Sequence, residues 1–288
     1  MTGRLTGKVA FVTGAGRGQG RSHAVRMASE GADIIAVDLC EDIPSNEYPL
    51  ATDADLAETA KLVESYDRRV ITRKADVRER SQLGEAVEAG IAEFGRLDIV
   101  VANAGIAPFG KRASIQAYFD TMGTNYVGVL NSVEASLPHI EDGGSIICTG
   151  STAALMTHGT SNPAFGPGGA GYTTSKRHIA RLVHELAAHL AGRRIRVNAI
   201  HPYNVNTDML HSAPMYRAFR PDLENPTREE VEPVLANTSP MELKWLEPGD
   251  VSDTVVFLAC DESQYITGMQ FKIDGGQMLP MSSPGVAD

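Results

Sequence analysis

The chain has 288 residues, which is enough for one α/β domain with a substantial core, so its length does not require two domains. Hydrophobic residues make up 42% and charged residues 22% of the chain, and both values are typical of a globular protein. The formal net charge of −10 argues against binding nucleic acid through a general basic surface. It leaves an anionic cofactor open, because backbone dipoles can hold a phosphate on an acidic protein.

Cysteine spacing and hydropathy favour a reducing environment without a membrane. Cys40, Cys148 and Cys260 are far apart and odd in number, so they show neither a disulfide framework nor a zinc spacing. The eight histidines are scattered as well, and no metal site is expected. Residues 1–8 lack the apolar region of a secretory signal, and no apolar run reaches the roughly 20 residues of a membrane span. We therefore predict a cytoplasmic protein with no membrane segment.

The first predicted strand, residues 9–13, ends in a glycine-rich turn, and a helix is predicted over 20–30. The turn has the sequence Thr13-Gly14-x-x-x-Gly18-x-Gly20. Bare backbone N–H groups and the positive end of the helix make such a turn a site for a diphosphate. A turn without any ligand is the alternative, because the spacing differs from the common Gly-x-Gly-x-x-Gly.

The second predicted strand, residues 33–38, ends in a carboxylate that indicates the cofactor. Asp38 is placed to accept hydrogen bonds from the ribose hydroxyls of a dinucleotide, although a solvated strand end or a helix cap is the alternative. Arg17 in the turn could instead meet the 2′-phosphate of NADP. Asp38 would repel that phosphate at close range in a partly desolvated site, so we predict NAD rather than NADP.

Residues 39–55 are too long for a tight connection between a strand and a helix. Their prolines and aromatic residue are typical of an ordered flap beside the cofactor, and a surface insertion without a role is the alternative. A helix is predicted over 56–66, with Thr52 as its N-cap and Asp55 completing a capping box.

The middle of the chain continues the alternation, and its last helical region is one long helix or two abutting ones: strand 70–74, helix 78–94, strand 97–102 and helix 114–137. Asp76-Val77 follows the first of these strands and could contact the adenine. Asn103-Ala104-Gly105 follows the second, where small residues would let a cofactor approach the backbone. Ordinary turn chemistry is the alternative for both.

A candidate proton-transfer pair follows the fifth predicted strand, residues 145–149. Tyr172 and Lys176 begin a helix predicted over 172–191, and their spacing of four places them on one face. A nearby cation favours the phenolate and lowers the pKa of a tyrosine, so the pair suits proton transfer with an alcohol or carbonyl. Ser151 could hold the substrate oxygen. A solvated helix pair and an N-cap serine are the alternatives.

The last part of the chain contains strand 195–200, a long irregular or helical segment over 203–246, helix 248–260 and strand 270–273. Segment 203–246 leaves the sheet at its carboxyl edge, where ligands of such folds bind, so we interpret it as a substrate lid. Its candidate lining residues are apolar or aromatic, with ordinary helix packing as the alternative: Met209, Leu210, Met215, Tyr216, Phe219 and Trp245. His201 is interpreted as a packed or capping residue.

The strands are rich in Val, Ile and Ala and lack polar alternation, which predicts a sheet buried on both faces. Because helices alternate with them, the sheet should be parallel. We therefore predict a Rossmann-type, doubly wound α/β fold of about seven strands with helices on both faces, in one domain over 1–288.

Taken together and in order, the motifs resemble the short-chain dehydrogenase/reductase family over nearly the whole chain: Thr13-Gly14-x-x-x-Gly18-x-Gly20, Asp38, Asp76-Val77, Asn103-Ala104-Gly105, Asn125, Ser151, Tyr172-x-x-x-Lys176 and Asp274-Gly275-Gly276. The resemblance implies hydride transfer between a nicotinamide and the carbinol carbon of a substrate. It makes Tyr172 the acid/base, with Lys176 holding the ribose and lowering the pKa of the tyrosine. Ser151 would orient the substrate oxygen, and Asn125 would anchor a proton-relay water.

The same resemblance implies a set of cofactor contacts: Gly14, Arg17, Gly18, Gln19, Gly20, Asp38, Leu39, Asp76, Val77, Asn103, Ala104, Gly105, Tyr172, Lys176, Pro202, Val205 and Thr207. Two departures from the family pattern matter. Tyr203 follows Pro202 where the family usually has glycine, which weakens the implied backbone contact with the nicotinamide carboxamide. The stretch between Ser151 and Tyr172 is also long and is expected to reshape the substrate entrance.

Two local features are similar to a narrower branch, the actinobacterial, mycofactocin-coupled dehydrogenases often labelled carveol dehydrogenases. They are the extension after Asp38 and the stretch from His201 to Met209. This likeness implies a tightly bound NAD that passes its electrons to an external redox partner, mycofactocin, and a homotetramer. It also implies an alcohol dehydrogenase (EC 1.1.1.-) for a hydrophobic, terpenoid-like secondary alcohol such as carveol and its ketone. The alternatives are an NADP-linked ketoreductase and a catalytically idle NAD-binding sensor or scaffold.

Overall fold

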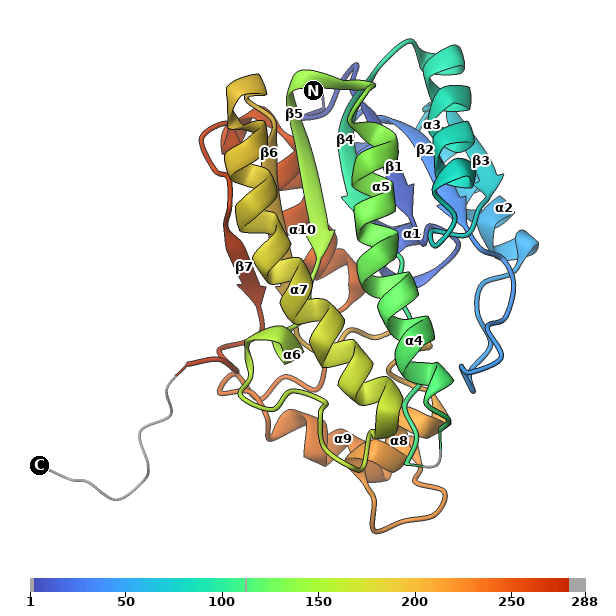
Figure 1. Cartoon of the computed structure of the whole chain (residues 1–288), viewed down its shortest axis with the longest axis vertical. Helices are drawn as coiled ribbons and strands as arrows, with labels where there is room; N and C mark the ends of the chain where they lie inside the picture. Colours follow the sequence, from blue (N-terminus) through green and yellow to red (C-terminus); the bar gives the residue numbers. More distant parts are fainter. Residues whose placement is uncertain (1–2, 112, 280–288) are drawn as a thin grey trace, which may run out of the picture.

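The computed structural model describes residues 3–111 and 113–279, and this part of the chain is built around one parallel sheet (Figure 1). The strand order is β3-β2-β1-β4-β5-β6-β7, and every neighbouring pair is parallel. The strands are β1 Val9–Thr13, β2 Asp33–Asp38, β3 Val70–Lys74, β4 Leu97–Ala102, β5 Ile140–Thr149, β6 Arg196–Pro202 and β7 Gln270–Ile273. The predicted Rossmann-type fold with seven strands is confirmed.

Helices cover both faces of the sheet: α1 Gly18–Ser29, α2 Asp53–Glu64, α3 Arg80–Phe94, α4 Gln116–Met122, α5 Gly128–Ser136, α6 Thr152–Leu155, α7 Gly166–Leu190, α8 Ala213–Phe219, α9 Arg228–Ala236 and α10 Pro248–Ala259. Apolar residues of α1, α2 and α10 form the core on one face, and those of α3, α5 and α7 form the core on the other. Strands β1, β4 and β6 are consequently buried at every residue, which explains why β1 is apolar up to Thr13 and β4 is apolar apart from Asp98. Strand β6 also buries Arg196, Asn198 and His201, and each of these side chains has hydrogen-bond partners.

Two elements begin at least five residues earlier than predicted. Strand β5 begins at Ile140 rather than at residue 145, because Ile140 pairs with Leu97 beyond an irregularity in the ladder. Helix α7 begins at Gly166 rather than at Tyr172, so Tyr172 lies in its second turn. Glycine weakens a helix in isolation, but here it allows close packing: a Cβ on Gly171 would lie 3.0 Å from the Tyr118 carbonyl oxygen of α4. Tertiary packing therefore sets this helix start.

The region predicted as one long helix or two abutting ones consists of α4 and α5 with a π-helical turn, η1, over Gly123–Val127. Asn125 lies inside this turn. Such turns frequently occur at functional sites, because the extra residue shifts a side chain out of the regular helical register.

The segment 203–246 carries the short helices α8 and α9, which lie beyond the carboxyl ends of the strands (Figure 1). Ser212 caps α8, and a Thr227–Glu230 capping box begins α9. A parallel bridge between Val205 and Leu246 joins the two ends of the segment. The segment is thus an excursion from one point of the fold, located over the edge where ligands of such sheets bind.

Within the described residues, no helix combines the length and the apolar character required to cross a bilayer.

A buried histidine couples the stability of this fold to pH. His23 of α1 is fully buried, and its Nδ1 lies 2.9 Å from the Ser252 Oγ of α10. Burial lowers the pKa of His23 to about 3, whereas the unfolded chain has a value of about 6.5. The contribution of His23 to the free energy of unfolding is therefore complete above about pH 6.5. At lower pH only the unfolded state takes up the proton, so the free energy of unfolding is lower by roughly 2 kcal/mol at pH 5.

We expect His23→Gln to remove this part of the pH dependence. Urea unfolding at pH 7.5 and pH 5 would measure it, with the exposed His158→Gln as the matched control. The difference between the two pH values should shrink by roughly 2 kcal/mol in His23→Gln and stay unchanged in His158→Gln. Equal pH dependence in the wild type and His23→Gln would contradict the assignment.

Candidate active site

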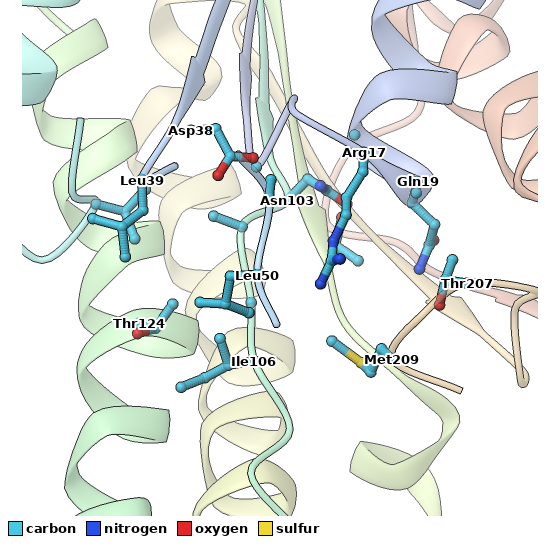
Figure 2. A pocket seen from close by; sticks show the side chains of 18 of the residues that line it. Arg17, Gln19, Asp38, Leu39, Leu50, Asn103, Ile106, Thr124, Thr207 and Met209 are labelled. Carbon is cyan, nitrogen blue, oxygen red and sulfur yellow. The ribbon is translucent and has the colours of Figure 1, made fainter. Parts of the chain in front are cut away.

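The glycine-rich turn between β1 and α1 forms the floor of a groove at the carboxyl edge of the sheet (Figure 2). Gly14 and Gly18 have φ values of 67° and 54°, which favour glycine. A Cβ on Gly20 would lie 1.9 Å from the Gly14 carbonyl oxygen, so this close approach also requires glycine. The turn consequently leaves bare backbone at the N-terminus of α1, where a diphosphate is favoured.

Asp38 stands at the rim of this groove, at the end of β2 (Figure 2). Its Oδ2 accepts a hydrogen bond from the Gly16 N–H at 2.8 Å, and its Oδ1 accepts one from the Cys40 N–H at 3.3 Å. Each carboxylate oxygen can accept a further hydrogen bond. The carboxylate therefore fixes the glycine turn and can still receive ribose hydroxyls.

Arg17 is engaged by protein groups. Its guanidinium forms an ion pair with Asp208 at 2.9 Å and donates a hydrogen bond to the Pro49 carbonyl. Arg17 therefore joins the glycine turn to the extension on one side and to the segment 203–246 on the other. These partners favour a role of Arg17 in connecting the two sides of the groove over a role in binding a 2′-phosphate.

The extension after Asp38 is ordered and lines the groove through Ile43, Tyr48, Leu50 and Ala51. Tyr48 is buried, and its hydroxyl accepts a hydrogen bond from the Ala107 N–H at 3.1 Å. Further contacts fasten the extension to α4 and α8: Ser45 Oγ to Asp120 Oδ2 at 2.6 Å, and Glu47 to Arg217 at 2.5 Å. A surface insertion without a role would not need this number of long-range polar contacts.

One end of the groove is an apolar slot. Leu39, Leu50 and Ile106 lie around it, and Thr124 of η1 stands beside them (Figure 2). Asp76 and Val77 also line this end, but the Asp76 carboxylate is held by Arg78 at 2.6 Å. Apolar walls with few polar groups suit a flat base such as adenine.

These three parts fit a dinucleotide. The bare glycine turn suits the diphosphate, Asp38 suits the adenosine ribose, and the apolar slot suits the base. The groove brings together every predicted cofactor residue except Val205, which lines the neighbouring cavity instead. Val205 is turned away because its backbone bridges to Leu246.

The predicted proton-transfer residues lie at the other end of the groove. Ser151, Tyr172 and Lys176 all line it, and Ser151 also caps α6 by accepting the Ala153 N–H at 3.2 Å. Lys176 Nζ donates to the Thr149 carbonyl at 2.7 Å and lies 5.6 Å from the centroid of the Tyr172 ring. The serine thus has a structural role in addition to its place in the site.

Burial dominates the protonation of this pair. It lowers the pKa of Lys176 to about 8 and raises the pKa of Tyr172, with the Ser151 hydroxyl offsetting part of the rise. The direction for Tyr172 is opposite to the sequence expectation. The expectation counted the nearby ammonium, whereas desolvation of the phenolate outweighs it and the ammonium points to the Thr149 carbonyl.

Asn125 and Asn103 hold the backbone around the site. Asn125 is fully buried; its amide accepts from the Ile106 N–H at 2.8 Å and donates to the Ile106 carbonyl at 2.9 Å. One lone pair and one N–H of its side chain are therefore engaged by the backbone of Ile106. Asn103 donates to the Thr13 carbonyl and accepts from Thr149 Oγ1, which ties the ends of β1, β4 and β5 together.

His201 is buried beneath the turn that carries Ser151. Its Nδ1 lies 2.9 Å from the Ser151 carbonyl oxygen and 3.2 Å from the Ser151 nitrogen, and its Nε2 lies 2.7 Å from Gln270 Oε1. This geometry agrees with the interpretation of His201 as a packed residue that supports Ser151.

A second cavity, of about 350 Å³, adjoins the groove and shares Ser151 and Tyr172 with it. Of the predicted lid residues, Met209, Leu210, Met215 and Phe219 line this cavity. Tyr216 and Trp245 do not line it. The Tyr216 hydroxyl lies 2.7 Å from His211 Nδ1, and the Arg228 guanidinium lies over the Trp245 ring. Both rings pack against the apolar cluster that includes Met215 and Leu235.

Sequence reasoning missed several residues of both sites. Phe109 and Phe165 form a wall against Tyr172, with ring centroids 5.6 Å apart for Phe109–Tyr172 and 5.0 Å apart for Phe109–Phe165. Neither belongs to a periodic pattern, since Phe109 lies in an irregular segment and Phe165 precedes α7. Tyr48 could have been identified from the sequence, because it is the aromatic residue of the extension.

Comparison with known proteins agrees with this geometry. Residues 14–278 match the family described as enoyl-(acyl carrier protein) reductase. A putative short-chain type dehydrogenase/reductase of Mycolicibacterium smegmatis is 44% identical, over 97% of this chain and 100% of that protein. The (−)-trans-carveol dehydrogenase of Rhodococcus erythropolis is 41% identical over 96% and 99%. The crystal structure of carveol dehydrogenase from Mycobacterium avium in complex with NAD superposes with a TM-score of 0.90 at 42% identity, covering 97% of this chain and 100% of that one.

Proposed function

The chain belongs to the short-chain dehydrogenase/reductase family, and we propose that it is an NAD-dependent oxidoreductase that interconverts a hydrophobic secondary alcohol and its ketone. One observation carries the proposal: Ser151 and Tyr172 lie on the wall shared by the dinucleotide groove and the adjoining apolar cavity. An alcohol in that cavity would meet both the acid/base and the nicotinamide end of the groove. The relatives that are named carveol dehydrogenases support an alcohol substrate.

In this proposal NAD is the hydride acceptor, and residues of the chain bind the substrate oxygen and transfer its proton. Ser151 and Tyr172 hold the substrate oxygen, and Tyr172 takes the hydroxyl proton during oxidation or returns it during reduction. Lys176 has a pKa of about 8 and is therefore mostly charged at pH 7. Its ammonium beside the ring favours the phenolate against the effect of burial.

The proposal is tested by the absorbance spectrum of the purified protein before and after adding a panel of apolar secondary alcohols. Reduced nicotinamide should appear with at least one alcohol and should disappear on adding the matching ketone. A protein that binds NAD but reduces none with any alcohol, and oxidises no NADH with any ketone, would instead support the idle sensor or scaffold.

We also propose that the extension retains NAD between turnovers. Tyr48 anchors it to Ala107 and Arg17 anchors it through Pro49, so release of the dinucleotide requires these contacts to open. The purified protein is expected to carry NAD through desalting. Tyr48→Ala should release NAD at least about tenfold faster, since it removes a buried aromatic anchor.

Exchange of bound NAD for labelled NAD measures this rate, and Tyr66→Ala, a change at an exposed tyrosine, is the control. Wild-type protein that emerges from desalting without NAD and exchanges added NAD rapidly would indicate that the extension is a surface insertion without a role. So would equal exchange rates for wild type and Tyr48→Ala.

The oligomeric state and an external redox partner are further parts of the proposal. Three apolar side chains are exposed along α4 and η1, with 64%, 59% and 40% of their surface accessible: Ile115 at the N-cap of α4, Phe119 within α4 and Val127 of η1. Exposed apolar residues on neighbouring turns are typical of a contact surface. They support the homotetramer that the family likeness implies, and mycofactocin is the electron acceptor implied by the narrower branch.

A further inference from the structure

The volume of the apolar cavity indicates the size of a substrate that would fill it. An apolar cavity of about 150 Å³ holds one benzene molecule, which amounts to about 25 Å³ for each carbon atom. At the same occupancy, the cavity of about 350 Å³ beside Tyr172 holds about 14 non-hydrogen atoms. This is more than one six-membered ring with short substituents needs, and it fits two linked or fused rings.

The body of the cavity is shaped for rings. Phe109 meets the Tyr172 ring edge to face, Phe165 meets Phe109, and Phe219 meets Phe165 at 6.2 Å between centroids. Met215 completes this wall from α8. Flat aromatic faces with adaptable methionine side chains suit apolar rings, because such rings gain extended contact without a directed hydrogen bond.

A polar group interrupts this apolar lining. Gln277 follows β7 and lines the cavity, and its Oε1 is buried without a hydrogen-bond partner. The turn that carries it is fixed: the Asp274 carboxylate accepts the Gly276 and Met278 N–H groups at 3.0 and 3.1 Å, and Ser239 Oγ donates to the Gly275 carbonyl. The unpartnered amide therefore belongs to a braced wall of the cavity.

Gln19 also lines the cavity and its Oε1 is buried without a partner, but Gln19 belongs to the wall shared with the dinucleotide groove, whereas Gln277 lines the cavity alone. The other polar residues near Gln277 have partners. Thr238 Oγ1 donates to the Leu235 carbonyl at 2.7 Å and also pairs with the Tyr203 hydroxyl. Asn204 also interacts with that hydroxyl and lowers the pKa of Tyr203 against the rise caused by burial. A buried amide without a partner is unfavourable, so a substrate group that bonds to Gln277 is bound selectively. Rotation about its terminal torsion lets either the oxygen or the NH₂ group face the cavity.

We propose that the substrate is a two-ring alcohol with a second hydroxyl or carbonyl group remote from the reacting carbon, and that Gln277 recognises this second group. The inference rests on the proposed function and adds the substrate class. A sphere of 350 Å³ is about 9 Å across. Two linked six-membered rings span a similar length. Ser151, Tyr172 and Gln277 all line the cavity, and the proposal places the reacting hydroxyl at Ser151 and Tyr172 and the remote group at Gln277.

Two alcohols with the same ring skeleton test the proposal: 4-cyclohexylcyclohexanol and bicyclohexyl-4,4′-diol. With the wild-type holoenzyme, kcat/KM for the diol, corrected for its two equivalent hydroxyls, should exceed that for the mono-alcohol at least about tenfold. Gln277→Met should bring this ratio to about one by raising KM for the diol more than KM for the mono-alcohol. Cyclohexanol, with a single ring, should have a kcat/KM at least about tenfold below that of either two-ring alcohol.

Binding provides a readout that does not depend on turnover. In the Tyr172→Phe background the diol should bind more tightly than the mono-alcohol, and Gln277→Met should abolish the difference. Gln264→Met, at an exposed glutamine, is the control and should retain the wild-type ratio. A diol that is no better than the mono-alcohol, or a ratio that Gln277→Met leaves unchanged, would overturn the inference while leaving the proposed function intact. Absence of turnover with every alcohol and the corresponding ketones would count against the proposed function itself.

Discussion

Tyr172→Phe is expected to lower kcat by about 1,000-fold or more while NAD stays bound. In the proposed mechanism the phenolate oxygen of Tyr172 takes the proton from the substrate alcohol, and positioned acid/base groups typically contribute about 100- to 10,000-fold. The ring itself remains, so its edge-to-face contact with Phe109 and the packing of α7 are retained. Steady-state kcat with a saturating alcohol, together with the NAD content of the purified variant, measures both halves of the expectation.

Tyr66→Phe is the matched control, because Tyr66 is an exposed tyrosine after α2 and lines neither site. It should retain wild-type kcat. If Tyr172→Phe also turned over at the wild-type rate, the proposed mechanism would be wrong. If it lost NAD together with activity, the loss would reflect a damaged groove, and the acid/base assignment would lose its support.

Asp38→Asn is expected to weaken NAD binding about 10- to 100-fold and to weaken NADP binding much less. A hydrogen bond to a charged group contributes about 1.5–3 kcal/mol, and the carboxamide loses that charge. The 2′-phosphate of NADP gains from the same change, because the like charge at the rim is removed. Asparagine keeps the shape of the side chain, and its carbonyl can still accept the Gly16 N–H that holds the turn.

Dissociation constants for the two dinucleotides, measured on protein stripped of cofactor, decide this prediction. Asp67→Asn, at an exposed carboxylate away from the groove, should leave both constants unchanged. Equal weakening of NAD and NADP by Asp38→Asn would mean that Asp38 supports the turn alone and does not select the cofactor.

Both predictions concern residues that could be found from sequence, because their chemistry depends on local spacing. Tyr172 and Lys176 share a face wherever they are helical, and a carboxylate that ends the second strand reaches the groove in any fold of this kind. Helix α7 shows the limit of such reasoning. Its first turn contains glycines that no propensity would place in a helix, and close packing against the backbone at Pro108 and Gly110 decides that they are helical.

The dinucleotide groove was predictable to a greater extent than the substrate cavity. The groove is assembled from strand ends, which parallel pairing brings to one edge. The cavity is assembled from an irregular segment before α4, the residues before α7, the lid and the turn after β7. No periodicity connects these segments, so Phe109, Phe165 and Gln277 became recognisable as neighbours only in three dimensions.

The sequence by itself determined the doubly wound sheet, the glycine turn and the order of the proposed catalytic residues. Strands covered on both faces are mostly apolar, close backbone approach requires glycine, and helical spacing places Tyr172 beside Lys176. Only the tertiary structure decided the partners of Arg17, the raised pKa of Tyr172 and the unpartnered amide of Gln277. The physical reason is that burial and long-range hydrogen bonds depend on residues that are distant in the chain, and these set desolvation and pairing.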